Sequence, residues 1–251
     1  MRRFLVERDA IKGTRAIITG APFHHAARVV RLRRGDLIAL FDGSGAEWIA
    51  RVASVRRDQL EAEILREASG LEPPVAVTLL QAVLKGERMD WLVQKCSELG
   101  VARLVPMLTE RAVARAPADR APARRKRWQR ISDSAAEQCG RCRPMAVEAV
   151  APLAEAAREL AAADLALVPH EAERNRGLRD LLAQKAGATS VAIAIGPEGG
   201  FTEGEVEALV AAGGVRVSLG PCILRAETAA LFAASAVLYA LGDLGSASTA
   251  R

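Results

Sequence analysis

Residues 192–205, AIAIGPEGGFTEGE, predict a buried strand, a tight glycine loop and the start of a helix. The apolar run Ala192–Ile195 has the length and composition of a buried strand. Gly199–Gly200 has no Cβ atoms, so a ligand can approach the bare backbone there. Thr202 and Glu205 have the spacing of a capping box, in which each side chain accepts a hydrogen bond from a backbone N–H at the helix start. A plain strand-to-helix turn has the same pattern, so this loop alone does not establish a ligand site.

A second stretch, residues 217–229 (VSLGPCILRAETA), repeats the order of strand, Gly-Pro loop and helix. Its helix, predicted over Ala226–Leu241, is apolar on nearly every side, which is typical of a helix buried in a core or an interface. The helix is too short for a membrane span. Two Gly-Pro loops, each at the end of a strand, can face one crevice, and ligands of open α/β sheets bind in such crevices. We therefore expect one binding site built from both loops.

The two motifs together, IGPEGGF at 195–201 and LGPCILRAETA at 219–229, closely resemble the RsmE-type family. Its members are bacterial methyltransferases of 16S ribosomal RNA that methylate N3 of one uridine, and they belong to the SPOUT superfamily. The resemblance implies an α/β fold with a SPOUT-type trefoil-knotted parallel sheet, helices on both faces, and a small PUA-like β-barrel domain before it. It also implies S-adenosylmethionine as the cofactor, held by both loops. The expected cofactor-binding residues are Ile195, Gly196, Pro197, Gly199, Gly200, Leu219, Gly220, Ile223, Leu224, Thr228 and Ala229.

Composition and charge predict a folded cytoplasmic protein with an anionic partner. The 251 residues are 50% hydrophobic, and the net charge of +5, with a pI of about 9.4, favours association with anions. The four cysteines are sparse and show no disulfide-scaffold spacing, which is typical of a reducing compartment. Met1–Val6 is not followed by the long apolar run of a signal peptide, and no other stretch predicts a membrane span.

Two domains are expected, with residues 1–70 as a PUA-like β-barrel RNA-binding domain and residues 71–251 as the S-adenosylmethionine-dependent methyltransferase domain. The segment 68–74 ends in Pro73-Pro74, which continues neither a helix nor a strand ladder, and it is the predicted boundary. Before it, the pattern predicts a helix at 23–32 and short strands at 4–6, 16–19, 37–41, 48–55 and 60–65. The turn Asp42–Gly45 joins the third and fourth of these strands. After it, predicted strands at 75–82, 101–108 and 165–168 alternate with predicted helices at 87–99, 123–138, 153–161 and 178–184, which indicates a parallel sheet.

Positive charge is concentrated between Arg111 and Arg143. This stretch has a net charge of +7, whereas the whole chain has only +5. Basic residues next to Trp128 are typical of a surface that neutralises RNA phosphates, although a solvated helix face gives the same pattern. The resemblance supports the RNA interpretation. Lys85 follows a predicted strand and is a further candidate RNA contact, although an ordinary exposed lysine explains it equally well. The expected RNA-binding residues are Arg2, Arg3, Arg28, Lys85, Arg111, Arg124, Arg125 and Arg127.

Cys139-Gly140-Arg141-Cys142 has the spacing of a redox pair or of half a zinc site. No second CxxC is present, and of the three histidines only His170 lies in the larger domain, so we expect neither a metal nor a redox function. His24 and His25 do not share a helix face and are expected at a cap or on the surface. The chain also lacks the G-x-G-x-x-G fingerprint of the common Rossmann enzymes.

The implied reaction is in-line transfer of the methyl group of S-adenosylmethionine to uracil N3, which must lose its proton. The resulting negative charge spreads onto the two flanking carbonyl oxygens, where positioned cations or N–H donors stabilise it. Arg225 is the first catalytic candidate for this task, and an ion pair with Glu227 or Glu198 is its structural alternative. Glu198 is a candidate proton acceptor that alternatively caps backbone N–H groups.

Two other functions fit the same sequence. In the first, a SPOUT methyltransferase modifies a ribose 2′-O or another base. In the second, the chain is a non-catalytic RNA-binding ribosome assembly factor, although such a factor needs no pair of cofactor loops. The expected partners are 16S ribosomal RNA or the small ribosomal subunit, and a second copy of the chain. The homodimer is expected because the helix Ala226–Leu241 has more apolar faces than one sheet covers.

Overall fold

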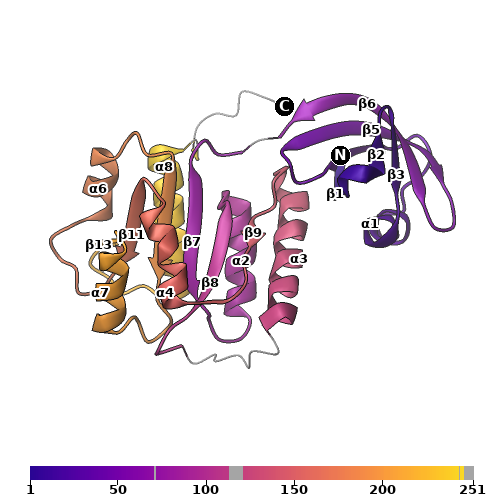
Figure 1. Cartoon of the computed structure of the whole chain (residues 1–251). Coiled ribbons are helices and arrows are strands. Elements are labelled where there is room, and N and C mark those ends of the chain that lie inside the picture. Colours follow the sequence, from indigo (N-terminus) through magenta and orange to yellow (C-terminus); the bar gives the residue numbers. More distant parts are fainter. Residues whose placement is uncertain (71, 113–120, 243, 246–251) are drawn as a thin grey trace. The chain divides into compact units, whose positions relative to one another are not determined.

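The computed structural model describes residues 1–70, 72–112, 121–242 and 244–245. It divides into two compact units (Figure 1). The first contains Met1–Glu72 together with Ala136–Pro144, and the second contains Pro73–Ala135 and Met145–Arg251. The segment Ala136–Pro144 therefore belongs to the N-terminal unit although it comes much later in the chain.

The first unit is a curled six-stranded sheet (Figure 1). Its strands in spatial order are β1 (Arg2–Leu5), β4 (Leu37–Phe41), β5 (Ala46–Val55), β6 (Leu60–Ser69), β3 (Arg15–Ile18) and β2 (Ile11–Lys12). β1 and β4 are parallel, and the other neighbours are antiparallel. The turn Asp42–Gly45 joins β4 and β5. Both of its glycines have positive φ, which explains why glycine occupies these two positions. β6 continues to Ser69, four residues beyond the predicted end of that strand.

Alternating side chains of these strands form one core, which includes Phe4, Ile38 and Leu60. The predicted helix at 23–32 starts earlier and ends earlier than expected. It begins as α1 (Gly20–His24) and continues as a wider π-helical turn, η2 (His25–Val29), before Arg31 takes a positive φ of 59° that the helix cannot accommodate. A short 3₁₀ helix, η1 (Arg8–Ala10), follows β1.

The second unit contains a parallel sheet, as the alternating pattern predicted. Its main path is β10 (Ala151–Pro152), β8 (Arg103–Leu108), β7 (Ala76–Ala82), β12 (Ser190–Ile195), β11 (Leu165–Pro169) and β13 (Val215–Val217), and β9 (Ala146–Val147) also pairs with β8. Every pair is parallel. The loops that follow β7, β8, β11, β12 and β13 therefore share one edge of the sheet.

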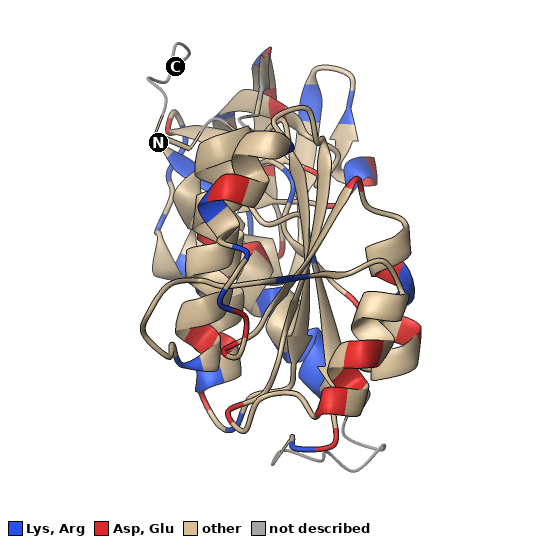
Figure 2. Ribbon diagram, turned by 90° about the vertical axis from the view of Figure 1, so that its left-hand side faces the viewer, with Lys and Arg blue, Asp and Glu red and all other residues tan. Residues whose placement is uncertain are grey.

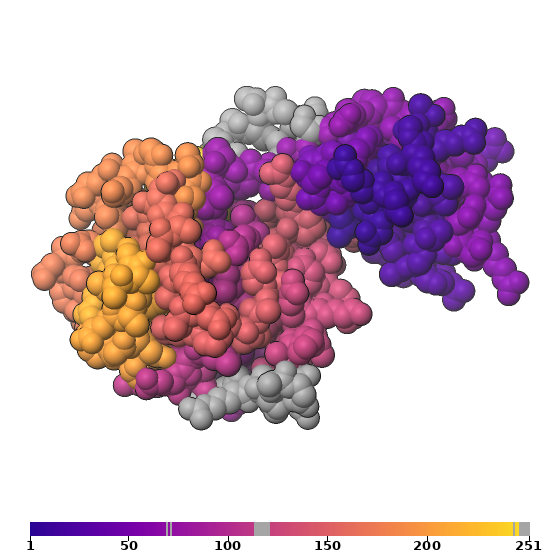
Figure 3. Space-filling view, viewed as in Figure 1, coloured from indigo at the N-terminus to yellow at the C-terminus, as the bar shows by residue number. Residues whose placement is uncertain are grey.

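Helices cover both faces of this sheet, as Figure 2 shows. One face packs on α2 (Arg88–Leu99), α3 (Ala121–Cys139), α6 (Leu178–Gln184) and α8 (Ala226–Leu241). The other face packs on α4 (Leu153–Ala156), α5 (Arg158–Ala161) and α7 (Glu203–Ala211). In Figure 3, α4 (salmon) and α7 (orange-yellow) lie side by side. A strand buried on both faces is apolar along its whole length, which explains the run Val191–Ile195.

Several helix ends follow from single residues that the sequence identifies. The capping box at α7 is confirmed, because Thr202 Oγ1 accepts from Glu205 N at 3.3 Å and a Glu205 carboxylate oxygen accepts from Thr202 N at 2.9 Å. Gly100 ends α2 in the left-handed conformation with φ 108°. The predicted helix at 153–161 is instead two short helices, since Leu160 N bonds to Ala157 O in a tighter turn. Within the described residues, no helix is both long enough and apolar enough to cross a membrane.

Candidate active site

Two Gly-Pro loops flank a third turn at the carboxyl edge of the parallel sheet. Residues 196–202, called loop 1, follow β12, and residues 218–225, called loop 2, follow β13. β11 lies between these two strands in the sheet, and the residues after it, 170–177, are called the β11 turn. The three segments line two adjoining pockets, one beside each Gly-Pro loop. This is the arrangement in which open α/β sheets bind their ligands.

Most of the expected cofactor residues line these pockets. The pocket at loop 1 has a volume of about 490 Å³, which is in the range of small-molecule sites. It is lined by Ile195, Gly196, Pro197, Gly199, Gly200, Ile223, Leu224 and Ala229 from the expected set. The smaller pocket at loop 2 adds Leu219 and Gly220. Thr228 is exposed and lines neither pocket.

The glycines of both loops give these pockets a backbone lining that a nucleoside-sized ligand fits. A Cβ on Gly196 would stand 3.1 Å from Phe201 N, a tight contact, so glycine lets loop 1 close on itself without a shift of its backbone. Gly200 and Gly220 have φ of 69° and 128°, which side-chain-bearing residues rarely adopt. A Cβ on Gly220 would meet no atom within 4 Å, so a substituent there projects into open space beside the pocket. The described residues thus fit S-adenosylmethionine.

Gln81 of β7 and Arg111, which follows β8, hold loop 1 in place. Arg111 Nη1 donates to Gly199 O at 3.1 Å and to Phe201 O at 3.4 Å. Gln81, fully buried at the end of β7, donates to Gly196 O at 3.4 Å. Arg111 is expected from the sequence to contact RNA, and in the structure its guanidinium donates to the backbone of loop 1.

The two catalytic candidates differ in whether their side chains already form hydrogen bonds and ion pairs. A Glu198 carboxylate oxygen accepts from Lys85 N at 3.2 Å and from Arg88 Nη1 at 3.3 Å, so Glu198 has the capping role that was its alternative. Arg225 is exposed, lines the loop 1 pocket and precedes α8 as its N-cap residue. Among the described residues Arg225 has no ion pair, so neither Glu227 nor Glu198 serves as its partner. Its guanidinium is therefore available to a ligand.

Most basic residues of α3 are exposed, and some of them form hydrogen bonds or ion pairs with neighbouring segments. Arg124 is half-buried, and the exposed Arg125 donates through Nε to Val147 O at 2.8 Å. Arg127 is exposed and forms an ion pair with Asp90 of α2. Trp128 is only 4% exposed and belongs to the core, which corrects its interpretation as part of a phosphate-binding surface. Lys85 is exposed, and the basic positions 115 and 120 lie outside the described residues.

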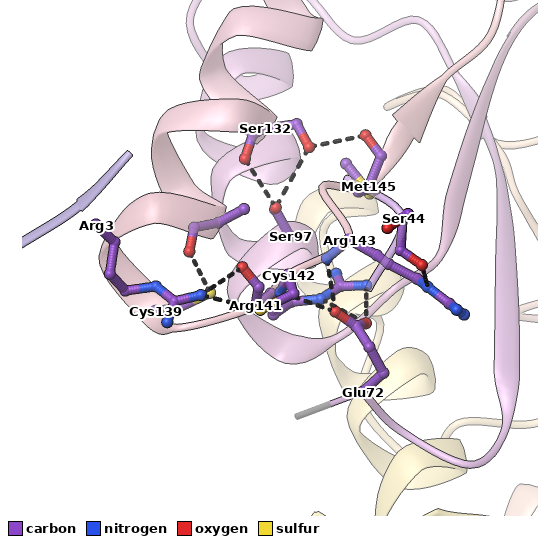
Figure 4. A network of polar contacts seen from close by, with 11 residues as sticks. Arg3, Ser44, Glu72, Ser97, Ser132, Cys139, Arg141, Cys142, Arg143 and Met145 are labelled. Atoms are coloured by element: carbon purple, nitrogen blue, oxygen red, sulfur yellow. Dashed lines mark hydrogen bonds and ion pairs between the residues drawn. The ribbon is translucent and has the colours of Figure 1, made fainter. Parts of the chain in front are cut away.

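In the first unit, the basic residues Arg3, Arg141 and Arg143 lie in a network of polar contacts, which Figure 4 shows. The Arg3 guanidinium forms an ion pair with Glu47, lies 5.1 Å from the centre of the Phe41 ring, and donates to Arg141 O at 3.1 Å. Arg141 is 6% exposed and forms an ion pair with Glu72 at 2.9 Å. Both arginines therefore hold this unit together, which argues against the predicted RNA contact of Arg3. Arg2 and Arg28 are exposed.

The CxxC motif lies in the same network. Cys139 is exposed, whereas Cys142 is buried and accepts a hydrogen bond from Arg3 Nη2 at 3.2 Å. Burial raises the pKa of the Cys142 thiol, and the Arg3 guanidinium opposes this shift. Both thiols are free, and within the described ranges no three potential ligands are grouped in a way that could hold a metal ion. Cys142 packs as a core residue of the first unit.

Sequence reasoning missed the β11 turn as part of the site. Pro169 and Glu171 line both pockets, and His170 and Arg174 line the pocket at loop 2. Arg88, at the start of α2, lines the pocket at loop 1 and was also missed. A signal for the β11 turn was present, because residues that directly follow any strand of a parallel sheet reach the same edge.

Comparisons with known proteins show the family of this chain. The family of RNA methyltransferase domains matches residues 71–238, and the family of RNA methyltransferase PUA domains matches residues 18–65. Ribosomal RNA small subunit methyltransferase E of Bacillus subtilis is 33% identical over 227 residues, covering 88% of this chain and 89% of the relative. The enzyme of the same name from Mycobacterium bovis is 35% identical, covering 93% of this chain and 90% of the relative.

Solved structures agree as well. The chain is similar to a Neisseria gonorrhoeae ribosomal RNA small subunit methyltransferase E bound to S-adenosyl methionine, with 34% identity and a TM-score of 0.88 over 97% of this chain and 99% of the other. A Legionella pneumophila protein solved with bound cofactor SAM gives 33% identity and a TM-score of 0.87 over 96% and 98% of the two chains. These matches span both the curled sheet and the parallel sheet. The chain therefore belongs to the ribosomal RNA small subunit methyltransferase E (RsmE) family.

Proposed function

We propose that this chain transfers the methyl group of S-adenosylmethionine to N3 of a uridine in 16S ribosomal RNA. The observation that carries the proposal is the pair of Gly-Pro loops that meet beside the exposed Arg225. Family membership supports the substrate class, and the cofactor-bound N. gonorrhoeae relative supports the cofactor. Residues 1–70 would then serve as an RNA-binding domain and residues 71–251 as the methyltransferase domain, in the cytoplasm.

The residues of the two loops would bind the cofactor through backbone groups. When bound, the cofactor supplies an electrophilic methyl group on its sulfonium sulfur. Arg225 would stabilise the negative charge that spreads onto the uracil oxygens when N3 loses its proton. Glu198 would act by holding the Lys85 backbone and the Arg88 guanidinium beside the pocket, since its carboxylate already accepts from both. Holding both reactants in line supplies much of the rate.

The test of this proposal is methylation of ribosomal RNA from a strain that lacks the gene, followed by mass spectrometry of the digested RNA. We expect one new methyl group, on N3 of a uridine. A methyl group on a ribose 2′-O or on another base would support the first alternative, a methyltransferase with a different acceptor. RNA binding with no methyl transfer and no cofactor binding would support the second alternative, an assembly factor.

We also propose that the basic side of α3 binds RNA. Replacing Arg124, Arg125 and Arg127 together by glutamine should weaken RNA binding and flatten its dependence on salt. The slope of log affinity against log salt should fall by roughly 0.7 for each single-strand phosphate that the variant no longer neutralises. Filter binding over a salt series measures this slope. Cofactor binding should survive as the control, and an unchanged salt slope would mean that these arginines form only a solvated helix face.

A homodimer is proposed from the exposed side of α8. Phe232 and Tyr239 are 45% and 73% exposed, and they line a groove with Leu178 and Leu182 of α6. Large apolar side chains that share one exposed groove are typical of an association surface, and two-fold dimers are the commonest oligomers. We propose a second copy of the chain as the occupant of this groove.

Light scattering at low micromolar concentration should therefore give twice the chain mass of 26.7 kDa. Replacing Tyr239 by glutamate should shift the protein to the monomer, because burying an unpaired carboxylate in the interface is costly. The same change at the exposed Val210 of α7 should leave the dimer intact. A wild-type mass of 26.7 kDa with no concentration dependence would contradict the dimer.

A further inference from the structure

Glu171 lies where the two pockets of the site join. Among the described residues, five line both pockets, and Glu171 is the only one of these five with a charged side chain; the others are Pro169, Ile223, Leu224 and Ala229. Its position follows from the topology, because β11 lies between β12 and β13. The turn after β11 therefore emerges between the two Gly-Pro loops. A carboxylate is thus present at the border where the two pockets join.

The Glu171 carboxylate is exposed and makes no hydrogen bond or ion pair with the described residues. Among the described residues, Glu171 has no hydrogen-bond or ion-pair partner, whereas Glu173 accepts from Asn175 N at 2.7 Å and from Arg176 N at 3.1 Å. Those backbone donors lower the pKa of Glu173 and fix it in the turn. A Cβ on Gly200 would stand 3.3 Å from a Glu171 carboxylate oxygen, so the bare glycine leaves room around it. The turn itself is therefore held without Glu171, whose oxygens are left for a ligand.

The contents of the two pockets indicate which part of the cofactor faces Glu171. The loop 1 pocket contains, besides Glu171, the charged side chains Arg88, Glu198 and Arg225, and the methyl group must be delivered beside Arg225. The loop 2 pocket is lined by the polar side chains of His170 and Arg174 and by apolar residues that include Leu219 and Pro221, and this apolar part suits the flat adenine ring. In S-adenosylmethionine the ribose is covalently placed between the adenine and the sulfonium. A residue at the border of the two pockets consequently faces the ribose.

We propose that the Glu171 carboxylate accepts hydrogen bonds from the ribose 2′- and 3′-hydroxyls of the cofactor and is thereby a specificity-determining residue. An acidic side chain binds ribose hydroxyls in the same way in dinucleotide-binding folds, because two carboxylate oxygens match two adjacent O–H donors. The proposal rests on the proposed function for the identity of the ligand. It adds the side chain that recognises the sugar.

The test is isothermal titration calorimetry of wild type and Glu171→Ala with four ligands. These are S-adenosylmethionine, S-adenosylhomocysteine, 5′-methylthioadenosine, and an S-adenosylhomocysteine analogue that lacks both ribose hydroxyls. Hydrogen bonds to a charged group contribute enough for us to expect Glu171→Ala to weaken the first three ligands by about ten- to a hundredfold. The analogue without hydroxyls should bind wild type and variant equally, because neither interaction is then possible. Glu171→Gln, which keeps one acceptor oxygen, should give an intermediate loss.

Each other pattern would overturn the proposal in a recognisable way. A loss for S-adenosylhomocysteine but not for 5′-methylthioadenosine would assign Glu171 to the amino group of the cofactor. A loss for S-adenosylmethionine alone would assign it to the sulfonium. Equal affinities of wild type and variant for every ligand would overturn the proposal while leaving the proposed function intact, whereas a wild type that binds none of the ligands would overturn both.

A matched control keeps the result interpretable. Glu207 is an exposed glutamate of α7 that lines neither pocket, so Glu207→Ala removes the same group elsewhere on the same unit. It should bind all four ligands as wild type does. The melting temperature of each variant without ligand should equal that of wild type, since Glu171 has no partner within the described chain.

Discussion

Replacing Arg225 by alanine should lower the turnover of methyl transfer by about 100- to 1,000-fold, which is the typical effect of removing one donor from a developing anion. RNA affinity should fall far less, because the charge on the uracil oxygens develops only as N3 is deprotonated and methylated. The loss should not reflect misfolding. Arg225 is exposed and its side chain makes no capping bond to α8, so alanine leaves the helix intact.

The pH dependence of single-turnover rates distinguishes this role from simple positioning. Raising the pH should partly rescue Arg225→Ala, since more of the uracil has then already lost its proton. Arg225→Lys should retain part of the rate because it keeps the positive charge. Binding and turnover that fall equally, with no rescue at high pH, would instead make Arg225 a residue that positions RNA.

Replacing Gly220 by valine should abolish binding of S-adenosylhomocysteine, measured as the loss of its thermal stabilisation of the protein. A ligand that binds only the native state raises the melting temperature by mass action, so the wild type should show a clear shift at saturating ligand. Gly220 has φ 128° and open space beside its Cα. A valine there would strain loop 2 and place its side chain beside the pocket that the ligand needs.

Gly35→Val is the matched control for this experiment. Gly35 also has a positive φ, 96°, and also has no atom within 4 Å of a built Cβ, but it lies in the first unit and lines neither pocket. Both variants thus carry a comparable backbone strain. Gly35→Val should keep the ligand-induced shift although its own melting temperature falls. A wild-type shift in Gly220→Val would mean that loop 2 does not touch the cofactor.

The sequence by itself determined the parts of this protein that depend on neighbours along the chain. Strand and helix periodicity predicted the parallel sheet, and the bounds of α6 and α8 agree with the prediction. The capping box of α7 and the left-handed Gly100 were recognisable because each involves residues only a few positions apart. The two Gly-Pro motifs identified most of the pocket lining, since loops that follow parallel strands meet at one edge. The trefoil knot stays a prediction of the family resemblance.

Only the tertiary structure decided which side chains meet across long separations in sequence. Arg111 binds loop 1, 88 residues later in the chain, and Arg3 binds the backbone of Arg141 from 138 residues away. Charge patterning cannot separate such engaged arginines from solvated ones, because both have the same local sequence context. Burial of Trp128 and the border position of Glu171 were hidden for the same reason. The border position of Glu171 depends on the order of the strands in the sheet, and the burial of Trp128 depends on the packing of α3 against the core. Both are fixed by packing between elements rather than by any one of them.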